Sequence, residues 1–175
     1  MASVTTAASA LWFPHHFLGG ARYLGREGVF FQQAHNDCGG AALKMIFDHF
    51  GISLDYGLLL QRLADGPEGT TMLSIKKLAE AEGLLCAGWR LALQDLHDIP
   101  LPAVLLLRRN HFVVMASRSP AAEIQILDPV RGRLGISVCN LQTVWRGEIL
   151  LFCSPGRGAW QRGRWFGRRN HRRTG

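Results

Sequence analysis

The segment from Gln32 to Gly51 constrains this chain more than any other part of its 175 residues. It predicts an amphipathic helix that begins near Cys38 and ends before Gly51, because apolar residues recur there at helical spacing. These residues are Ala42, Leu43, Ile46, Phe47 and Phe50. A thiol in the first turn of a helix lies near unpaired backbone N–H groups and the positive end of the helix dipole, which favour the thiolate. Cys38 is therefore either an activated nucleophile or a small buried hydrophobe, and this segment alone leaves both interpretations open.

Three consecutive strands are predicted further along the chain, at 103–107, 111–116 and 123–127. His111 opens the second strand, and Asp128 follows the third. An imidazole and a carboxylate in these places can meet across the hairpin that joins the two strands. Together with a thiol they form an activated nucleophile. The imidazole takes the proton of the thiol and leaves a thiolate, and the carboxylate fixes the tautomer of the imidazole. The alternatives are a histidine that belongs to the core and an ordinary Asp-Pro turn.

These residues, in this order, resemble the double-glycine leader peptidases, a papain-like cysteine peptidase family that processes bacteriocin precursors. Its domain commonly forms the N-terminus of peptidase-containing ABC transporters. The resemblance runs from about Phe31 to Phe152, and it is specific because several motifs occur in one order with matching gaps. The segments that carry it are Gln32…Asp37-Cys38-Gly39…Ala42-Leu43…Met45-Ile46…Gly51, Leu101-Pro102-Ala103-Val104, Asn110-His111-Phe112-Val113-Val114, Asp128-Pro129…Gly132 and Trp145-Arg146-Gly147.

The resemblance implies catalytic roles for four residues. Cys38 would be the nucleophile, His111 the general base and acid, and Asp128 the group that orients His111. The side-chain amide of Gln32 would donate to the oxyanion, where a preorganised donor lowers the barrier by about 2.7–4 kcal/mol. Gln33 has the same chemistry, and only the interval of six residues to the cysteine, which matches the family, favours Gln32.

Two neighbours of the nucleophile have other expected roles. Asp37 is expected to cap the N-terminus of the helix. Gly39 is expected to let the substrate backbone approach the sulfur, because glycine has no side chain.

Length and composition indicate one globular domain, with 47% hydrophobic and 19% charged residues. Helices come first and strands later, which predicts an α+β fold. The resemblance implies the papain-like version, with N-terminal helices packed on an antiparallel sheet. Further helices are predicted near 54–64, 71–82, 94–98 and 140–145, and further strands near 84–93 and 148–152. The expected parts are an N-terminal extension (1–28), a peptidase domain (29–155) and an Arg-rich, disordered tail (156–175).

The formal net charge of +7 comes entirely from the tail, because residues 1–156 hold 13 basic and 13 acidic residues. The tail contains seven arginines and no acidic residue, with Trp160, Trp165 and Phe166 between them. Such a segment can contact an anionic membrane surface, nucleic acid or an acidic partner. The alternative is a solvated extension. No folded nucleic-acid motif accompanies the tail, so a specific nucleic-acid partner is not expected.

Localisation and cofactors follow from what the sequence lacks. No apolar run reaches the roughly 18–20 residues that span a bilayer. A secretory signal has basic residues before its apolar stretch, and the N-terminus of this chain has none before its own short apolar stretch. Cys86, Cys139 and Cys153 show no Cys-x-x-Cys spacing, which favours free thiols in a reducing compartment. The expected location is cytoplasmic or inner-membrane-associated, and a periplasmic location requires an export signal outside this sequence. No metal or organic cofactor is expected.

The sequence also lacks a Gly-x-x-x-x-Gly-Lys-Ser/Thr phosphate loop. We therefore expect a stand-alone peptidase, or a leader-handling partner of a separately encoded ABC-type or other exporter.

The resemblance implies the function of a cysteine endopeptidase that cleaves after Gly-Gly in leader peptides of exported precursors. One alternative is a domain that binds leader or cargo segments for a secretion system, including functional-amyloid export, without cutting them. Another is a papain-like amidase or transglutaminase-like enzyme, which shares the nucleophile and base but not the preference for glycine. The chain itself contains Gly19-Gly20 after bulky residues. Self-processing after Gly20 is thus a further hypothesis, and an N-terminal loop is the ordinary interpretation.

Overall fold

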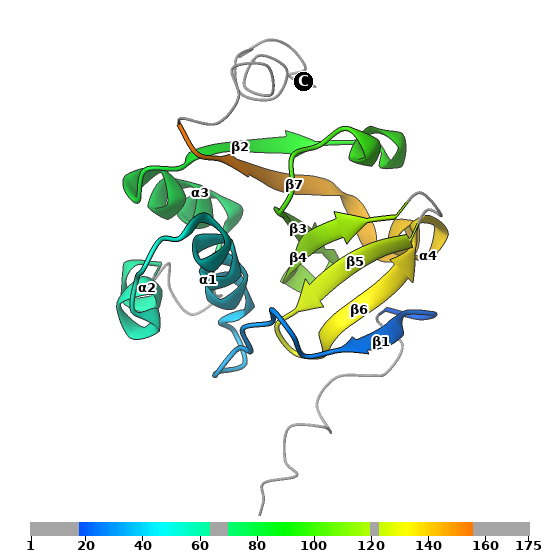
Figure 1. The fold of residues 1–175 in the computed structure, drawn as a ribbon, viewed down its shortest axis with the longest axis horizontal. Helices are drawn as coiled ribbons and strands as arrows, with labels where there is room; N and C mark the ends of the chain where they lie inside the picture. Colours follow the sequence, from blue (N-terminus) through cyan, green and yellow to red (C-terminus); the bar gives the residue numbers. More distant parts are fainter. Residues whose placement is uncertain (1–17, 64–69, 120–122, 156–175) are drawn as a thin grey trace, which may run out of the picture.

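Seven strands form one sheet in the computed structural model, which describes residues 18–63, 70–119 and 123–155 (Figure 1). The helices are α1 (Cys38–Phe50), α2 (Tyr56–Arg62), α3 (Met72–Ala81) and α4 (Val138–Val144). The strands are β1 (Arg22–Gly25), β2 (Leu85–Arg90), β3 (Ala103–Leu107), β4 (His111–Arg118), β5 (Glu123–Asp128), β6 (Gly132–Ser137) and β7 (Trp145–Cys153). Two short 3-10 turns, Leu93–His97 and Arg108–Asn110, precede β3 and β4.

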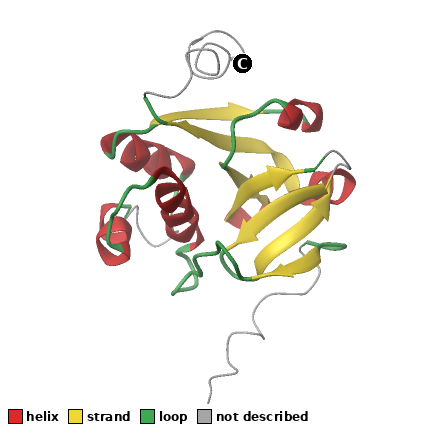
Figure 2. Cartoon of the chain, viewed as in Figure 1, coloured by secondary structure: helices red, strands yellow, loops and turns green. Residues whose placement is uncertain are grey.

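The strands lie in the order β1-β6-β5-β4-β3-β7-β2, and every neighbouring pair is antiparallel. Helices α1, α2 and α3 gather on one side of the sheet and α4 lies on the other (Figures 1 and 2). Helices packed on an antiparallel sheet are the α+β arrangement that the sequence predicts, so this prediction is confirmed.

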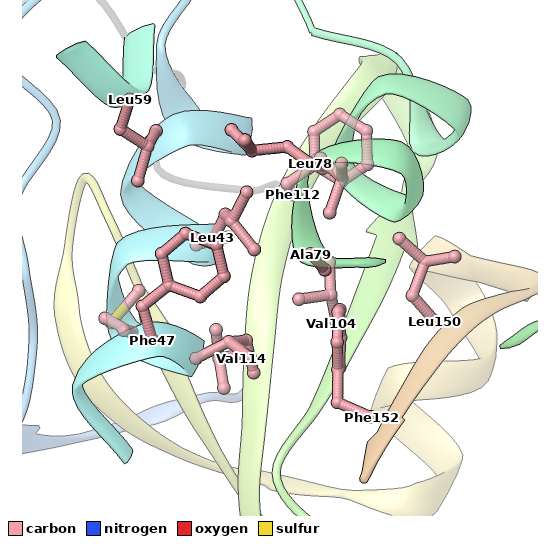
Figure 3. Close-up of a cluster of buried hydrophobic side chains, with 14 of the residues drawn as sticks. Leu43, Phe47, Leu59, Leu78, Ala79, Val104, Phe112, Val114, Leu150 and Phe152 are labelled. Carbon is pink, nitrogen blue, oxygen red and sulfur yellow. The ribbon is translucent and has the colours of Figure 1, made fainter. Parts of the chain in front are cut away.

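The sheet separates two hydrophobic cores, because successive residues of a strand point to opposite faces. In β3, Val104 belongs to the core under α1, α2 and α3, whereas Leu105 belongs to the core on the α4 side. Figure 3 shows the first core, in which Leu43 and Phe47 of α1 face Val114 of β4. Fully burying such a side chain contributes about 1.5–3 kcal/mol. The apolar stripe of α1 is therefore what holds Cys38, at its first residue, against the sheet.

Helix α1 begins and ends where its sequence pattern predicts. Gly51 has the left-handed φ of 73° that commonly ends a helix, and its N–H donates to the carbonyl of Asp48 at 3.2 Å. The N–H of Ile52 donates to the carbonyl of Phe47 at 2.9 Å. The C-terminal end of α1 is thus closed by backbone hydrogen bonds.

Strands β1 and β6 are absent from the sequence-based expectation. β6 contains Gly132 and Gly135, and glycine has little intrinsic preference for strands. It forms because β5 and β1 pair with it on either side. Since β1 joins the sheet and Leu18 is buried, the fold extends into the range 1–28, where the sequence predicts an N-terminal extension.

The remainder of that extension, 1–17, and the Arg-rich tail, 156–175, lie outside the described residues. None of the helices in the described ranges has both the length and the apolar character needed to cross a bilayer.

Candidate active site

Cys38 is the first residue of α1, and its side chain is partly buried. The carbonyl of Asp37, at the N-cap position, accepts the N–H of Ala41 at 2.9 Å. The Sγ atom of Cys38 lies 3.8 Å from the carbonyl oxygen of Asn110, the residue that precedes β4. The thiol therefore lies both at the positive end of the helix dipole and beside the strand that begins with His111.

A tight turn brings the start of β4 to the sulfur. Residues Arg108–Asn110 join β3 to β4, and Leu107 pairs with His111 across this turn. Arg109 and Asn110 have φ values of 63° and 55°, in the left-handed region that residues other than glycine seldom adopt. Strain of this kind is concentrated at functional sites. Here it accompanies a turn that directs the Asn110 carbonyl towards Cys38.

His111 and Asp128 meet across adjacent strands. The Nε2 atom of His111 lies 3.0 Å from Oδ1 of Asp128, whose side chain is only 1% exposed. The same carboxylate oxygen accepts the N–H of Val130 at 2.8 Å and of Arg131 at 3.3 Å. The turn after β5 therefore fixes the carboxylate, and the carboxylate fixes the orientation of the imidazole.

The protonation of this pair follows from competing effects. Burial alone would lower the pKa of His111, but its hydrogen bonds with Asp128 and Cys38 and their negative charges raise the pKa to about 9. Burial alone would raise the pKa of Asp128, but the hydrogen bond and charge of His111 and the N–H of Val130 lower it below its ordinary value. At neutral pH the structure thus favours an imidazolium, which donates from Nε2 to an ionised carboxylate.

Gln32 lies on the loop that leads into α1, and its backbone ties this loop to the Asp128 turn. The Gln32 N–H donates to the carbonyl of Pro129 at 3.0 Å. Its Nε2 donates to the carbonyl of Ala34 at 2.7 Å and more weakly to that of His35 at 3.3 Å. Its Oε1 is buried without a hydrogen-bond partner among the described residues. The amide contacts therefore stay within the loop.

The structure distinguishes Gln32 from its neighbour. Gln32 is partly buried beside the site, whereas Gln33 is exposed. Residue chemistry alone does not separate the two.

The structure contradicts the expected capping role of the Asp37 side chain. Asp37 is at the N-cap position, but its carboxylate makes no hydrogen bond to the first turn of α1. It instead accepts the N–H of Gln33 at 3.0 Å and of Ala34 at 3.1 Å, and the hydroxyl of Tyr56 at 2.9 Å. The carboxylate turns back to the preceding loop because that loop offers it two backbone donors at once. No spacing in the sequence signals the contact with Tyr56.

Gly39 also has a structural reason to lack a side chain. A Cβ atom there would lie 2.7 Å from Cβ of Thr70 and 3.2 Å from Cδ2 of Phe112. The space beside Gly39 is thus occupied by the protein itself, and the packing of α1 explains this glycine without reference to a substrate.

The other cysteines stand apart from this site. None of the four cysteines forms a disulfide, and Cys86 and Cys153 are buried whereas Cys139 is exposed. Burial raises the pKa of Cys86 to about 12, so this thiol stays protonated. Within the described ranges, no three histidine, cysteine or acidic side chains come together as a metal site.

The Gly19-Gly20 pair lies on the other side of the sheet from α1. A Cβ atom on Gly20 would lie 2.3 Å from Nδ2 of Asn140 in α4, and Leu18 is buried in the α4-side core. Cys38 belongs to α1, on the opposite face. A cut after Gly20 by the same molecule would therefore require the 18–25 segment to leave the sheet.

Comparison with known proteins identifies the family. A profile of the peptidase C39 family matches residues 26–157. The chain belongs to the peptidase C39 family. This C39 chain is 29% identical over 133 residues to the lactococcin-G-processing and transport ATP-binding protein LagD of Lactococcus lactis subsp. lactis. It is 32% identical over 129 residues to the colicin V secretion/processing ATP-binding protein CvaB of Escherichia coli. These matches cover 73% and 74% of the chain, but only 19% of LagD and 18% of CvaB.

A third relative is similar over most of its own length. The C39 chain is 30% identical over 176 residues to the "Probable functional amyloid protease FapD" of Pseudomonas aeruginosa, a match that covers 89% of the chain and 77% of FapD.

Two solved structures of peptidases from transporters share this fold. The crystal structure of a double glycine motif protease from an AMS/PCAT transporter, in complex with the leader peptide, superimposes with a TM-score of 0.68 and 24% identity. It covers 75% of this chain and 96% of that one. The peptidase domain of Streptococcus ComA gives a TM-score of 0.63 at 23% identity, over 72% of this chain and 97% of that one.

Proposed function

We propose that this C39 chain is a cysteine endopeptidase that cleaves after a Gly-Gly pair in the leader peptides of exported precursors. The observation that carries the proposal is that His111 contacts buried Asp128 while the Cys38 sulfur lies beside Asn110, the residue that precedes His111. A thiol at a helix N-terminus, a charged imidazole and an orienting carboxylate are the groups that acyl transfer by a cysteine requires. The family membership supports the same chemistry.

In the proposed reaction, the Cys38 thiolate attacks the carbonyl carbon of the second glycine, and the negative charge moves to the carbonyl oxygen. The C–N bond then breaks as the His111 imidazolium gives its proton to the leaving amine, which leaves a thioester. The neutral imidazole next takes a proton from water, and the resulting hydroxide attacks the thioester. Breaking the C–S bond releases the leader with a free carboxyl group and restores the thiolate–imidazolium pair.

Gln32 is the proposed oxyanion donor, together with the Cys38 backbone N–H. An amide nitrogen carries two hydrogens, and the strong contact with Ala34 at 2.7 Å uses one of them. The weaker contact with His35 at 3.3 Å is the one that an oxyanion would replace. The loop contacts of the amide are thus compatible with this role.

The substrate class is proposed from the relatives. LagD and CvaB are processing proteins of lactococcin G and colicin V export, and a double glycine motif protease of the same fold is known with its leader peptide. The partner proposed for this chain is accordingly an exporter of leader-bearing precursors. The match to FapD over most of the length of both proteins favours a second candidate substrate, a precursor in functional-amyloid export.

The decisive experiment compares wild type with Cys38→Ala on synthetic precursors that carry a Gly-Gly leader. Cys139→Ala is the matched control, because Cys139 is also a free thiol but is exposed and lies on α4. We expect wild type and Cys139→Ala to cleave, and Cys38→Ala to leave the peptide intact.

Mass spectrometry of the products locates the cut. A junction after the second glycine supports the proposal, and loss of cleavage when both glycines become alanine supports the glycine preference. Cleavage elsewhere would indicate another papain-like activity. Binding of the precursor by wild type without any cleavage would indicate a leader-binding domain.

A further inference from the structure

Two acidic side chains, Asp37 and Asp128, are buried in the part of the chain that the structure describes. A buried carboxylate is costly unless it is hydrogen-bonded, so each needs partners and invites a functional explanation. For Asp128, the contact with His111 supplies that explanation. Asp37 is 5% exposed and takes no part in the proposed reaction, although it directly precedes the nucleophile.

The Asp37 carboxylate is the centre of a hydrogen-bonded loop. It accepts the N–H groups of Gln33 and Ala34 at 3.0 and 3.1 Å. The carbonyl of the same Ala34 accepts the Gln32 side-chain amide at 2.7 Å. The two peptide units that precede the Ala34 carbonyl are thus held by a carboxylate one residue from Cys38, which links the loop that carries Gln32 to the start of α1.

Tyr56, the first residue of α2, supplies the third donor to this carboxylate. Its hydroxyl lies 2.9 Å from Oδ2 of Asp37 and 3.4 Å from the Asp37 carbonyl oxygen. The side chain is 8% exposed, and its ring lies against Phe30 with the ring centroids 4.5 Å apart. Burial, followed by the hydrogen bond and the charge of Asp37, raises the pKa of Tyr56 far above its ordinary value. The hydroxyl therefore stays protonated, and it remains a donor, across the whole working pH range.

We infer that Tyr56, acting through Asp37, is a positioning residue for the oxyanion donor Gln32. This inference rests on the proposed function, because it assigns a purpose to a hydrogen-bond chain that ends at Gln32. Tyr56 belongs to a different helix from Cys38, so the chain connects the α1–α2 packing with the geometry of the site. Neither Tyr56 nor Asp37 contacts the reacting atoms. Their effect is to keep the 32–37 loop in one conformation while charge develops.

The first test replaces only the hydroxyl. Tyr56→Phe keeps the ring against Phe30, and the control Tyr23→Phe removes the hydroxyl of a tyrosine that is 58% exposed on β1. We expect kcat to fall about 10-fold in Tyr56→Phe, since a hydrogen bond to a charged group is lost, while KM and the rate of Cys38 alkylation stay within about twofold. Tyr23→Phe should match wild type. A loss confined to KM, or wild-type kcat, would overturn the inference.

A double-mutant cycle with Gln32→Ala separates positioning from general stability. If Tyr56 acts through Gln32, then Tyr56→Phe costs little further kcat once Gln32 is alanine, whereas independent effects would multiply. Multiplying effects would reject the inference. Asp37→Asn changes the acceptor of the same hydrogen bond and should have the same effect on kcat. It replaces Tyr56→Phe in the cycle if that variant folds poorly.

Amide hydrogen exchange tests the loop without any substrate. We expect the N–H groups of Gln33 and Ala34 to exchange at least 10-fold faster in Tyr56→Phe than in wild type, with the α1 amides unchanged. Unchanged exchange at Gln33 and Ala34 would overturn the inference even if the kinetics supported it. Failure of wild type to cleave any Gly-Gly peptide would instead reject the proposed function, and the exchange rates would still decide whether Tyr56 holds the loop.

Discussion

The imidazole of His111 and the carboxylate of Asp128 form a partly buried contact of 3.0 Å between the first residue of β4 and the last residue of β5. The two strands are neighbours in the sheet, so the pairing of β4 with β5 sets this distance. The turn after β5 supplies two further donors to the carboxylate, from Val130 and Arg131. The site therefore contains a base whose ring this carboxylate orients and whose charged form it helps to stabilise.

Replacing that carboxylate should weaken the base. We expect Asp128→Asn to lower kcat/KM on the order of 100-fold, because the neutral amide neither stabilises the imidazolium nor fixes its ring as strongly. NMR titration of the His111 ring should show a pKa shifted from about 9 towards 6.5. Asp48→Asn is the control, since Asp48 pairs with Lys44 on the exposed side of α1. An unchanged His111 titration would contradict the orienting role of Asp128.

The pH profile should have an alkaline limb set by His111. The pKa is raised to about 9, so the proton needed by the leaving amine is lost as the pH rises past about 9, and kcat/KM should fall there. Acid should also reduce the rate, because it disrupts the ion pair on which the proposed attack depends. A rate independent of pH from about 4 to 9 would count against the thiolate–imidazolium pair.

The free energy of unfolding should depend on pH through His111 and Asp128, which act at opposite ends of the pH range. The raised pKa of His111 adds stability that is fully present below pH 6.5 and is lost as the pH rises through about 9. The lowered pKa of Asp128 adds stability that is present above about pH 3.8 and is lost as the pH falls below that value. Denaturant unfolding at several pH values measures both changes in the free energy of unfolding. Both changes should be smaller in Asp128→Asn than in wild type.

The two adjacent glutamines should differ sharply. We expect Gln32→Ala to lower kcat by about 10²–10³-fold with little change in KM, because an oxyanion donor acts on the transition state. Gln33→Ala should retain nearly full activity, since that side chain is exposed. Equal activities of the two variants would remove Gln32 from the proposed oxyanion hole.

Gly39 and Gly88 form a pair for testing packing. Gly39→Ala places a methyl group 2.7 Å from Cβ of Thr70, so we expect a loss of about 1–3 kcal/mol in the free energy of unfolding. Gly88→Ala on β2 meets only Cδ2 of Leu150 at 3.5 Å, an ordinary contact, and should change stability by about 0.5 kcal/mol or less. Urea unfolding measures both, and a Gly39→Ala variant as stable as wild type would show that Thr70 gives way.

Self-processing should not occur within one folded molecule. Gly20 lies beside Asn140 on the side of the sheet away from α1, so we expect the purified protein to keep its full-length mass. Intact mass spectrometry after prolonged incubation checks this, with Cys38→Ala as the control. A product that begins at Ala21 in wild type alone would establish cleavage after Gly20.

Elements with a clear local sequence pattern are predictable without the structure. The apolar spacing after Cys38 and the glycine at 51 predict α1 to within a residue, and the apolar run at 103–107 predicts β3 with the same bounds. The order of thiol, imidazole and carboxylate also indicated the family. These features are readable because helical and strand periodicities depend on residues close together in the chain.

Features that depend on distant partners follow from tertiary contacts and not from any local pattern. β6 is a strand because β1 and β5 flank it, although its glycines argue against one. The Asp37 carboxylate faces its own loop and Tyr56, 19 residues away, and the Gln32 amide is held by Ala34. A buried polar side chain forms hydrogen bonds with the donors and acceptors that the fold places near it. Which groups lie near it depends on burial and long-range packing, and no local pattern encodes these.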